Sequence, residues 1–315
     1  MKIKDIARSV LRPVYYFQLD IRKKAYSIIQ RSFAKRVLKN TYADEVDFFE
    51  SISNAKYTDN KFVCKDILRR VHQVDKVLLF KKRFDKSSTI KGYEICKENF
   101  KPTMASDVIV SKWADDILEE YYADDRGCGD APIVDDNSPV ILDRLIKTRR
   151  SIRSYTSDKV SEEDLDKILT AGLWAPSGCN RQNIEYLVID KEEDVMFCQK
   201  LAGEGNAFPR EAAMNIVILV DPRALALPAQ RHCSYLEAGA AIQNMLLTAH
   251  SLGLGMCWLF WSKIDLAFNE RFCLPRWLLP VAMVTLGQVK QYPKVIPVRK
   301  ELSDSIYDKR AEVNV

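Results

Sequence analysis

Histidine is scarce in this chain, and its cysteines are not spaced as metal sites require. The 315 residues include three histidines and eight cysteines, and no two cysteines form a Cys-x-x-Cys pair. Zinc sites are normally built from closely spaced Cys and His ligands. The sequence therefore indicates neither a zinc site nor a disulfide framework, and we expect reduced thiols.

Long hydrophobic runs are also absent. No stretch of eighteen uncharged apolar residues occurs, and the N-terminus lacks the apolar core and small-residue cleavage site of a signal peptide. We therefore expect a cytoplasmic protein that neither is secreted nor spans a membrane. No nucleic-acid partner is expected either. The composition, 47% hydrophobic and 29% charged, is typical of a soluble globular protein with one large domain or two ordinary ones.

Positive charge is concentrated at the N-terminus. Residues 1–40 carry eleven Lys or Arg against two Asp, a net charge of +9, whereas the whole chain carries +5. Apolar residues between Ile3 and Leu38 recur at helical spacing, which predicts a basic amphipathic helix. Such a helix can adsorb to an anionic membrane surface or partner, or it can pack on the protein body with its basic face in solvent. Both interpretations stay open.

The rest of the N-terminal half looks mainly helical. Residues 123–137 are rich in Asp, Gly and Pro, which is typical of a linker. We therefore predict a helical extension over 1–137, with its basic arm at 1–40, and a second domain over 138–315. The expected helices of the extension are Asp44–Ser53, Lys61–Phe80 and Ala105–Tyr122.

Helices and strands alternate in the second half. A helix is predicted at Val140–Arg149, and another begins at the capping pattern Ser161-Glu-Glu-Asp164 and ends near Trp174. This alternation favours an α+β fold built on a mixed sheet that helices flank. The strand candidates are Ile184–Ile189, Asn215–Val220, Cys257–Trp261 and Leu279–Leu286.

Two clusters of unusual residues lie between Leu145 and Gln182. The first, which we call the arginine cluster, consists of Arg149, Arg150, Ser151 and Arg153. Guanidinium groups bind phosphate oxygens in a bidentate manner, and a hydroxyl can add a further hydrogen bond. The cluster therefore indicates an anion site, although three arginines at a helix end can also form a solvated surface.

The second cluster, residues 175–182, is called the amide loop below. Its sequence, APSGCNRQ, combines the helix breakers Pro176 and Gly178 with the amide side chains of Asn180 and Gln182. Breakers predict a loop, and amides offer both donors and acceptors. The loop is therefore expected to present hydrogen-bonding groups to a flat polar ligand edge.

The arginine cluster and the amide loop, in this order, resemble two motifs of the nitroreductase family of FMN-dependent oxidoreductases. The segment GAAIQNMLLTAHSLGLGMCW, from Gly239 to Trp258, resembles the family's long helix and the Gly-Leu-Gly motif after it. The segment Pro297–Leu302 resembles its closing Arg-x-x-Leu. One departure is Asn183, which stands where the family usually has proline. The resemblance implies the nitroreductase fold, bound FMN, and NAD(P)H as a transient electron donor.

The resemblance also implies roles for individual residues. Arg149, Ser151 and Arg153 would hold the FMN phosphate or ribityl chain and Arg299 would complete the phosphate grip, while Arg150 would share that work or face solvent. In the family the two FMN sites lie at the interface of a homodimer, so the second chain would supply part of each site. The residues expected to line the flavin ring are Pro176, Ser177, Asn180 and Gln182, with Gly253 and Gly255 where the backbone approaches it. The Gly-Leu-Gly segment can equally be a helix end and turn.

The chemistry expected from this resemblance needs no protein nucleophile, because the flavin N5 carries out the two-electron transfer. The favoured function is hydride transfer from NAD(P)H, by a ping-pong mechanism, to a nitro compound, quinone or other conjugated acceptor. A second hypothesis is a flavin dehydrogenase or oxidase in a biosynthetic pathway, such as cell-surface polysaccharide assembly. A third is a membrane-peripheral assembly protein with a vestigial flavin fold, which the intact arginine cluster and Asn180 argue against.

Overall fold

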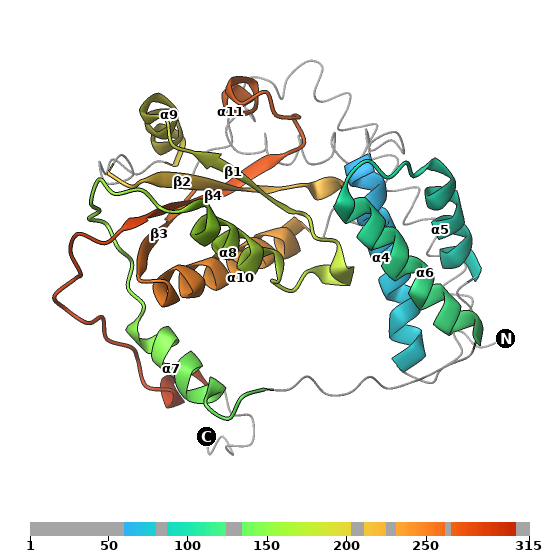
Figure 1. The fold of residues 1–315 in the computed structure, drawn as a ribbon, viewed down its shortest axis with the longest axis horizontal. Coiled ribbons are helices and arrows are strands. Elements are labelled where there is room, and N and C mark those ends of the chain that lie inside the picture. The colour runs from blue at the N-terminus through green and yellow to red at the C-terminus, as the bar shows by residue number, and fades with distance from the viewer. Residues whose placement is uncertain are drawn as a thin grey trace, which may run out of the picture.

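The computed structural model describes residues 60–79, 87–123, 134–202, 211–224, 231–261 and 266–306. A four-stranded sheet carries helices on both faces, and a group of three helices lies beside it (Figure 1). The predicted basic arm and the predicted helix Asp44–Ser53 lie outside the described residues. Within the described ranges, no helix is both long enough and apolar enough to cross a membrane.

The three helices beside the sheet are α4 (Asn60–Leu79), α5 (Ser87–Asn99) and α6 (Ala105–Ala123). Along α4, Val63, Ile67, Val71 and Val74 recur every three or four residues, so they share one helix face and pack into a core with α5 and α6. The predicted helices corresponding to α4 and α6 are confirmed to within one residue, whereas α5 was not delimited. The boundary at 137/138 stays a prediction.

The sheet has the strand order β1-β2-β4-β3. Its α+β class is confirmed, but each pairing among the described strands is antiparallel, not mixed as expected. The connection through α9 (Glu192–Ala202) brings β2 back from the end at which β1 stops, so these neighbours run in opposite directions. The strands are β1 (Ile184–Ile189), β2 (Met214–Val220), β3 (Leu254–Phe260) and β4 (Leu279–Gln288).

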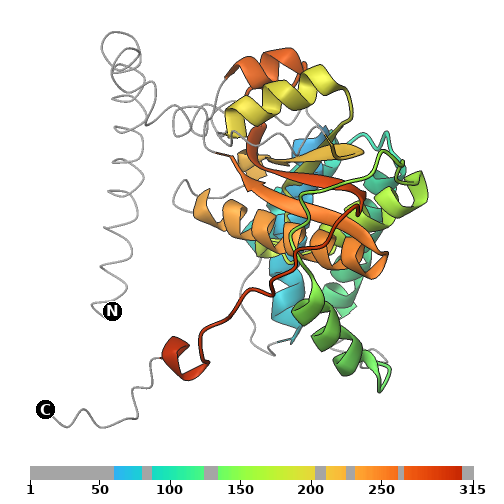
Figure 2. The same cartoon turned by 90° about the vertical axis from the view of Figure 1, so that its left-hand side faces the viewer.

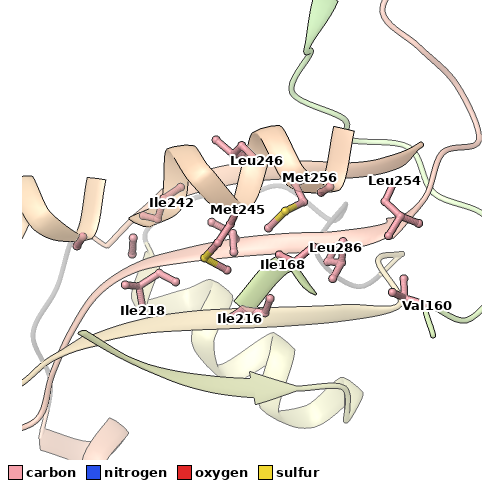
Figure 3. Close-up of a cluster of buried hydrophobic side chains, with 14 of the residues drawn as sticks. Val160, Ile168, Ile216, Ile218, Ile242, Met245, Leu246, Leu254, Met256 and Leu286 are labelled. Atoms are coloured by element: carbon pink, nitrogen blue, oxygen red, sulfur yellow. The ribbon is translucent and has the colours of Figure 1, made fainter. Parts of the chain in front are cut away.

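Both faces of the sheet are covered by helices. Alternate residues of β2 point to opposite faces: Ile216 and Ile218 belong to one hydrophobic cluster, and Val217 and Leu219 to the other. The first cluster packs against α8 (Glu162–Leu173) and α10 (Arg231–Ser251), as Figure 3 shows. The second packs against α9 and α11 (Leu266–Arg271), so three layers result (Figure 2).

Two further helices begin as the sequence indicates. The Ser161 hydroxyl accepts a hydrogen bond from the Asp164 amide at 3.0 Å, which confirms the predicted N-cap of α8. Helix α7 (Ser138–Thr148) precedes the arginine cluster and contacts α10, yet none of its residues is buried. Short 3-10 turns occur at η1 (Gly178–Asn180), η3 (Pro222–Ala224) and η5 (Ser303–Ser305).

Candidate functional site

Residues 150–156 lie across the ends of β3 and β4. The Ile152 amide donates to the Met256 carbonyl and the Thr156 amide to the Gln288 carbonyl, each at 3.0 Å. Ile152 and Tyr155 are both buried, and the Tyr155 hydroxyl donates to the Ile152 carbonyl at 2.6 Å. The apolar positions of the motif therefore anchor this segment to the sheet and leave Ser151 half-buried and Arg153 exposed.

Gly255 allows this close approach. It lies within β3, and a Cβ atom added there would come within 2.8 Å of the Ile152 side chain. Gly253 has a φ of 76° in the turn that joins α10 to β3, a conformation that favours glycine. Packing and turn geometry thus account for both glycines, and their contact with a flavin stays a prediction.

The arginines lie where α7 ends. The Arg150 guanidinium donates to the carbonyls of Lys147 and Arg149, each at 2.7 Å, so part of its work is to satisfy the carbonyl groups at the helix end. The Arg149 guanidinium points into a partly buried space, and its Nη1 atom is buried without a hydrogen-bond partner. Arg299 is exposed but close enough for its charge to act on Arg149.

The electrostatics of Arg149 favour an anion. Burial lowers the pKa of its guanidinium, and the positive charges of Arg150 and Arg299 lower it further. A buried donor without a partner costs free energy, as does the mutual repulsion of like charges. A phosphate group would supply the missing acceptor and the opposite charge together, so these residues fit the phosphate of FMN.

His250, which was not among the residues predicted from the sequence, lies beside the end of α7 and the arginine cluster. Its Nε2 atom is 2.8 Å from the Thr148 hydroxyl, whose proton is donated to the Arg144 carbonyl at 2.7 Å. Nε2 therefore carries the hydrogen in this contact. Burial lowers the pKa of His250, and the charges of Arg149 and Arg150 act in the same direction. Its position in the last turn of the long helix was the signal that could have revealed it.

The amide loop has an unusual backbone. Cys179, Asn180 and Gln182 have φ values of 57°, 51° and 49°, in the left-handed region that costs most residues about 1–3 kcal/mol each. The Ser177 hydroxyl accepts a hydrogen bond from the Gln182 backbone amide at 3.1 Å. The Gln182 side chain donates to the side-chain oxygen Oδ1 of Asn180 at 3.3 Å. Pro176 and Gln182 are exposed. The loop is thus held in a conformation that its residues do not favour by themselves.

Glu237 of α10 supports the amide loop through a hydrogen bond to its backbone. Its Oε1 atom accepts a hydrogen bond from the Gly178 amide at 2.7 Å, and the Arg181 side chain donates to the Gly178 carbonyl. Burial raises the pKa of Glu237, and the Gly178 amide, Arg181 and Asn183 partly offset that rise. A Cβ atom at Gly178 would lie 2.6 Å from the Arg181 guanidinium. Glu237 is therefore a buried support of the loop.

Asn183, at the position where the family usually has proline, gives the loop a further attachment. Its side chain is fully buried and donates to the Ser234 hydroxyl of α10 at 3.0 Å. Its carbonyl accepts from the Asp221 amide at 2.9 Å. A proline keeps the backbone carbonyl but has no side-chain donor, so this departure adds one hydrogen bond, from the Asn183 side chain to Ser234.

The two clusters lie near opposite ends of α10 (Figure 1). Glu237 contacts the amide loop and His250 contacts the end of α7. Thirteen helical residues separate them, which corresponds to about 20 Å along the axis. A flavin that contacted both clusters of one chain would have to span most of this distance.

An open pocket of about 650 Å³ lies beside Tyr155 and Lys290, and neither the arginine cluster nor the amide loop lines it. Its remaining lining residues are Thr156, Ser157, Glu211, Ala212 and Ala213. None of the predicted cofactor residues lines it. The candidate cofactor site is therefore defined by its charges and hydrogen bonds, not by this pocket.

Comparison with known proteins assigns the family. Residues 146–288 match the model of the nitroreductase family. A protein of Archaeoglobus fulgidus with the provisional name NADH dehydrogenase/NAD(P)H nitroreductase is 32% identical, over 48% of this chain and 84% of its own length. The chain therefore belongs to the nitroreductase family. Helices α4, α5 and α6, together with Arg299, lie outside the residues that the family model matches.

Two further similarities were found. The protein of Bacillus subtilis named FMN reductase (NAD(P)H) is 30% identical over 36% of this chain and 47% of its own length. A crystal structure from Desulfovibrio desulfuricans, provisionally described as a nitroreductase in complex with FMN, shares 34% identity. It covers 54% of this chain and 96% of its own, with a TM-score of 0.46.

Proposed function

We propose that this protein is an FMN-dependent oxidoreductase that takes hydride from NADH or NADPH and delivers it to a nitro compound, a quinone or another conjugated acceptor. Membership of the nitroreductase family makes the chain an NAD(P)H-dependent flavin oxidoreductase. The observation that carries the cofactor assignment is the half-buried Arg149 guanidinium, whose buried Nη1 atom has no hydrogen-bond partner and lies near two further positive charges.

At the arginine cluster, the chain binds the phosphate. Arg149 donates its free Nη1 hydrogen to a phosphate oxygen, and Arg299 adds a second positive charge from the C-terminal segment. Arg150 is held by backbone carbonyls and serves mainly to stabilise the end of α7. His250 contributes a ring whose pKa is lowered by burial and by the charges of Arg149 and Arg150.

At the amide loop, the chain binds the ring. Bound FMN supplies the two-electron chemistry at its N5 position. The Asn180 and Gln182 side chains offer the donors and acceptors that such a ring edge requires, and the loop is held in place before the ligand binds. Donor and acceptor then bind in turn over the same ring face, which gives ping-pong kinetics.

A second copy of the chain completes each site. Because the two clusters lie about 20 Å apart along α10, the arginine cluster of one protomer and the amide loop of another would contact one flavin. Helix α7 exposes Val140, Ile141, Leu142 and Ile146 by 52–70%, and contiguous exposed apolar surface of this kind marks an interface. We therefore propose a homodimer with FMN at its interface.

Mixed dimers test the shared site. In a dimer of one Arg149→Ala chain and one Asn180→Ala chain, a shared geometry places both defects in one site and leaves the other intact. We expect the purified heterodimer to bind FMN with parent affinity at half the parent stoichiometry, although each variant alone binds weakly. If each site used both clusters of a single chain, the mixture would contain no intact site, and this outcome would contradict the shared geometry.

The function itself is tested with the purified protein. We expect a yellow protein with about one FMN per chain, because both the phosphate and the ring determinants are present. Stopped-flow mixing with NADH or NADPH should bleach the flavin absorbance, and an added quinone should restore it. A colourless preparation that also fails to bind added FMN would overturn the proposal.

A further inference from the structure

Helix α4 contacts residues of the sheet domain through a second face. While Val63 and Ile67 pack against α5 and α6, Lys65 points out of that helical group toward the sheet. Its ammonium group donates to Glu185 Oε1 at 2.8 Å and to Asp221 Oδ2 at 2.9 Å. These partners lie 120 and 156 residues further along the chain. A single buried lysine thus joins the helical extension to the first two strands.

The charges around Lys65 are balanced. Burial by itself would lower the pKa of the ammonium group, but Asp221 and Glu185 outweigh it and raise the pKa. Asp221 is fully buried and also accepts two hydrogen bonds from the Arg223 guanidinium, at 3.0 and 2.8 Å. Burial tends to raise the pKa of this carboxyl group, yet Lys65 and Arg223 hold it at about 2. The contact is therefore a charged one at neutral pH.

The same carboxylate residue holds the amide loop. The backbone amide of Asp221 donates to the Asn183 carbonyl at 2.9 Å, and Asn183 directly follows the strained residue Gln182. Helix α4 also packs directly against η1, which contains Asn180, and against η3, which follows Asp221. The extension therefore contacts the loop twice, once through its surface and once through Lys65 and Asp221.

We propose that Lys65 is a positioning residue of the amide loop. Helices α4–α6 therefore contribute to the cofactor site. Through Asp221 and Asn183, Lys65 holds the loop in the left-handed conformation that presents Asn180 and Gln182. This proposal rests on the proposed function, because it concerns how the same loop binds the ring. It adds a role for residues outside the part of the chain that matches the family.

The proposal makes a specific distinction between ligands. Loss of the Lys65 contact leaves the arginine cluster untouched, because that cluster lies at the other end of α10. FMN and riboflavin share the ring and differ in the phosphate, so both should lose affinity by the same factor. Residues that act through a neighbour typically change a coupled binding equilibrium by about three- to thirtyfold. The midpoint potential of the bound flavin should shift as well, since the loop contacts the redox-active ring.

The test compares the full-length parent with Lys65→Met, Lys65→Arg and Lys61→Met. Lys61 is the matched control, because it binds the same Glu185 at 3.0 Å from an exposed position. Dissociation constants for FMN and riboflavin and the midpoint potential are measured for each variant. We expect Lys65→Met to weaken both ligands about equally and to shift the potential, Lys65→Arg to restore part of both, and Lys61→Met to match the parent.

Three outcomes would overturn the proposal. Lys65→Met could lower thermal stability and leave both affinities and the potential at parent values, which would make the contact purely structural. It could weaken FMN alone, which would place its effect at the phosphate. If the parent itself binds no flavin, the proposed function fails and this proposal fails with it. Where Lys65→Met does not fold, Lys65→Gln, which keeps one donor but no charge, is measured by the same criteria.

Discussion

The two ends of α10 hold their functional residues in opposite ways. At the C-terminal end, Arg149, Arg150 and Arg299 repel one another, and the Arg149 Nη1 atom has no partner. At the N-terminal end, Glu237 and Asn183 hold a strained loop by hydrogen bonds to the backbone and to α10. The arginine end thus carries positive charge that no carboxylate offsets in the contacts above. The loop end is held by hydrogen bonds, although Glu237 Oε2 and Asn183 Oδ1 are also buried without a partner.

This difference predicts which property each end controls. Groups that only a ligand satisfies contribute to affinity, since the ligand stabilises the folded state by mass action. Groups that satisfy one another contribute to the free energy of unfolding. Substitutions that remove supports of the amide loop should therefore lower stability together with affinity for the flavin ring, whereas those at the arginine end should lower phosphate affinity and leave stability nearly unchanged.

The largest expected effect is on stability, at Asp221. Asp221→Asn removes the carboxylate that Lys65 and Arg223 share and leaves two buried cations with reduced compensation. Breaking a buried ion pair in this way costs about 3–5 kcal/mol. Denaturant unfolding at pH 7 measures the loss. Asp143→Asn is the control, because its pair with Lys147 is exposed and such pairs contribute only about 0.3–0.5 kcal/mol.

Acid titration checks the same residue independently. The pKa of Asp221 falls from 3.8 to about 2 on folding, so its contribution is present above about pH 4 and is lost as the pH falls to about 2. A shift of this size corresponds to about 2 kcal/mol. The parent should lose this stability over that interval, and Asp221→Asn should not. Equal acid sensitivity in the two proteins would mean that another carboxylate dominates.

The next largest effect is on affinity, at Arg149. A charge-assisted hydrogen bond contributes about 1.5–3 kcal/mol, so Arg149→Ala should weaken FMN binding by about 10- to 100-fold. Riboflavin, which lacks the phosphate, should bind the variant and the parent alike. Arg144→Ala, an exposed position one turn earlier on α7, removes the same charge and should leave FMN affinity nearly unchanged. Equal FMN affinity for Arg149→Ala and the parent would assign the phosphate contact to Arg150, Arg153 and Arg299.

The smallest effect concerns pH, at His250. Its folded pKa lies below the unfolded value of 6.5, so the neutral ring contributes stability above pH 6.5 that is lost as the pH falls through the lowered pKa. A bound phosphate offsets the arginine charges and favours the protonated ring, so FMN binding should take up a proton. Lowering the pH from 8 to 6.5 should therefore tighten FMN binding relative to riboflavin.

His250→Gln separates this coupling from the titration of the phosphate itself. The glutamine amide can still donate to Thr148, but it cannot take up a proton in this range. The ratio of FMN to riboflavin affinity should therefore become less dependent on pH in the variant. An unchanged pH profile would place the coupled proton on the phosphate.

Much of the fold could be predicted from local pattern. The mainly apolar segment Ile184–Ile189 and the capping residue Ser161 mark their elements within a few residues, because these signals act within one turn or one strand. Helices α5 and α9 were not delimited. The buried residues of α9, Val195, Cys198 and Leu201, recur every three residues, so this helix has a local signal that the prediction did not use.

The candidate site, like the fold, could be predicted only in part from the sequence. The sequence by itself determined the residue types of the arginine cluster and the amide loop, because guanidinium and amide chemistry does not depend on the fold. Only the tertiary structure decided that these clusters lie at opposite ends of α10 and that His250 joins the first. It also decided that Lys65 supports the second through Asp221. Such contacts join residues 59 to 156 positions apart, and their geometry exists only once the sheet and helices have packed.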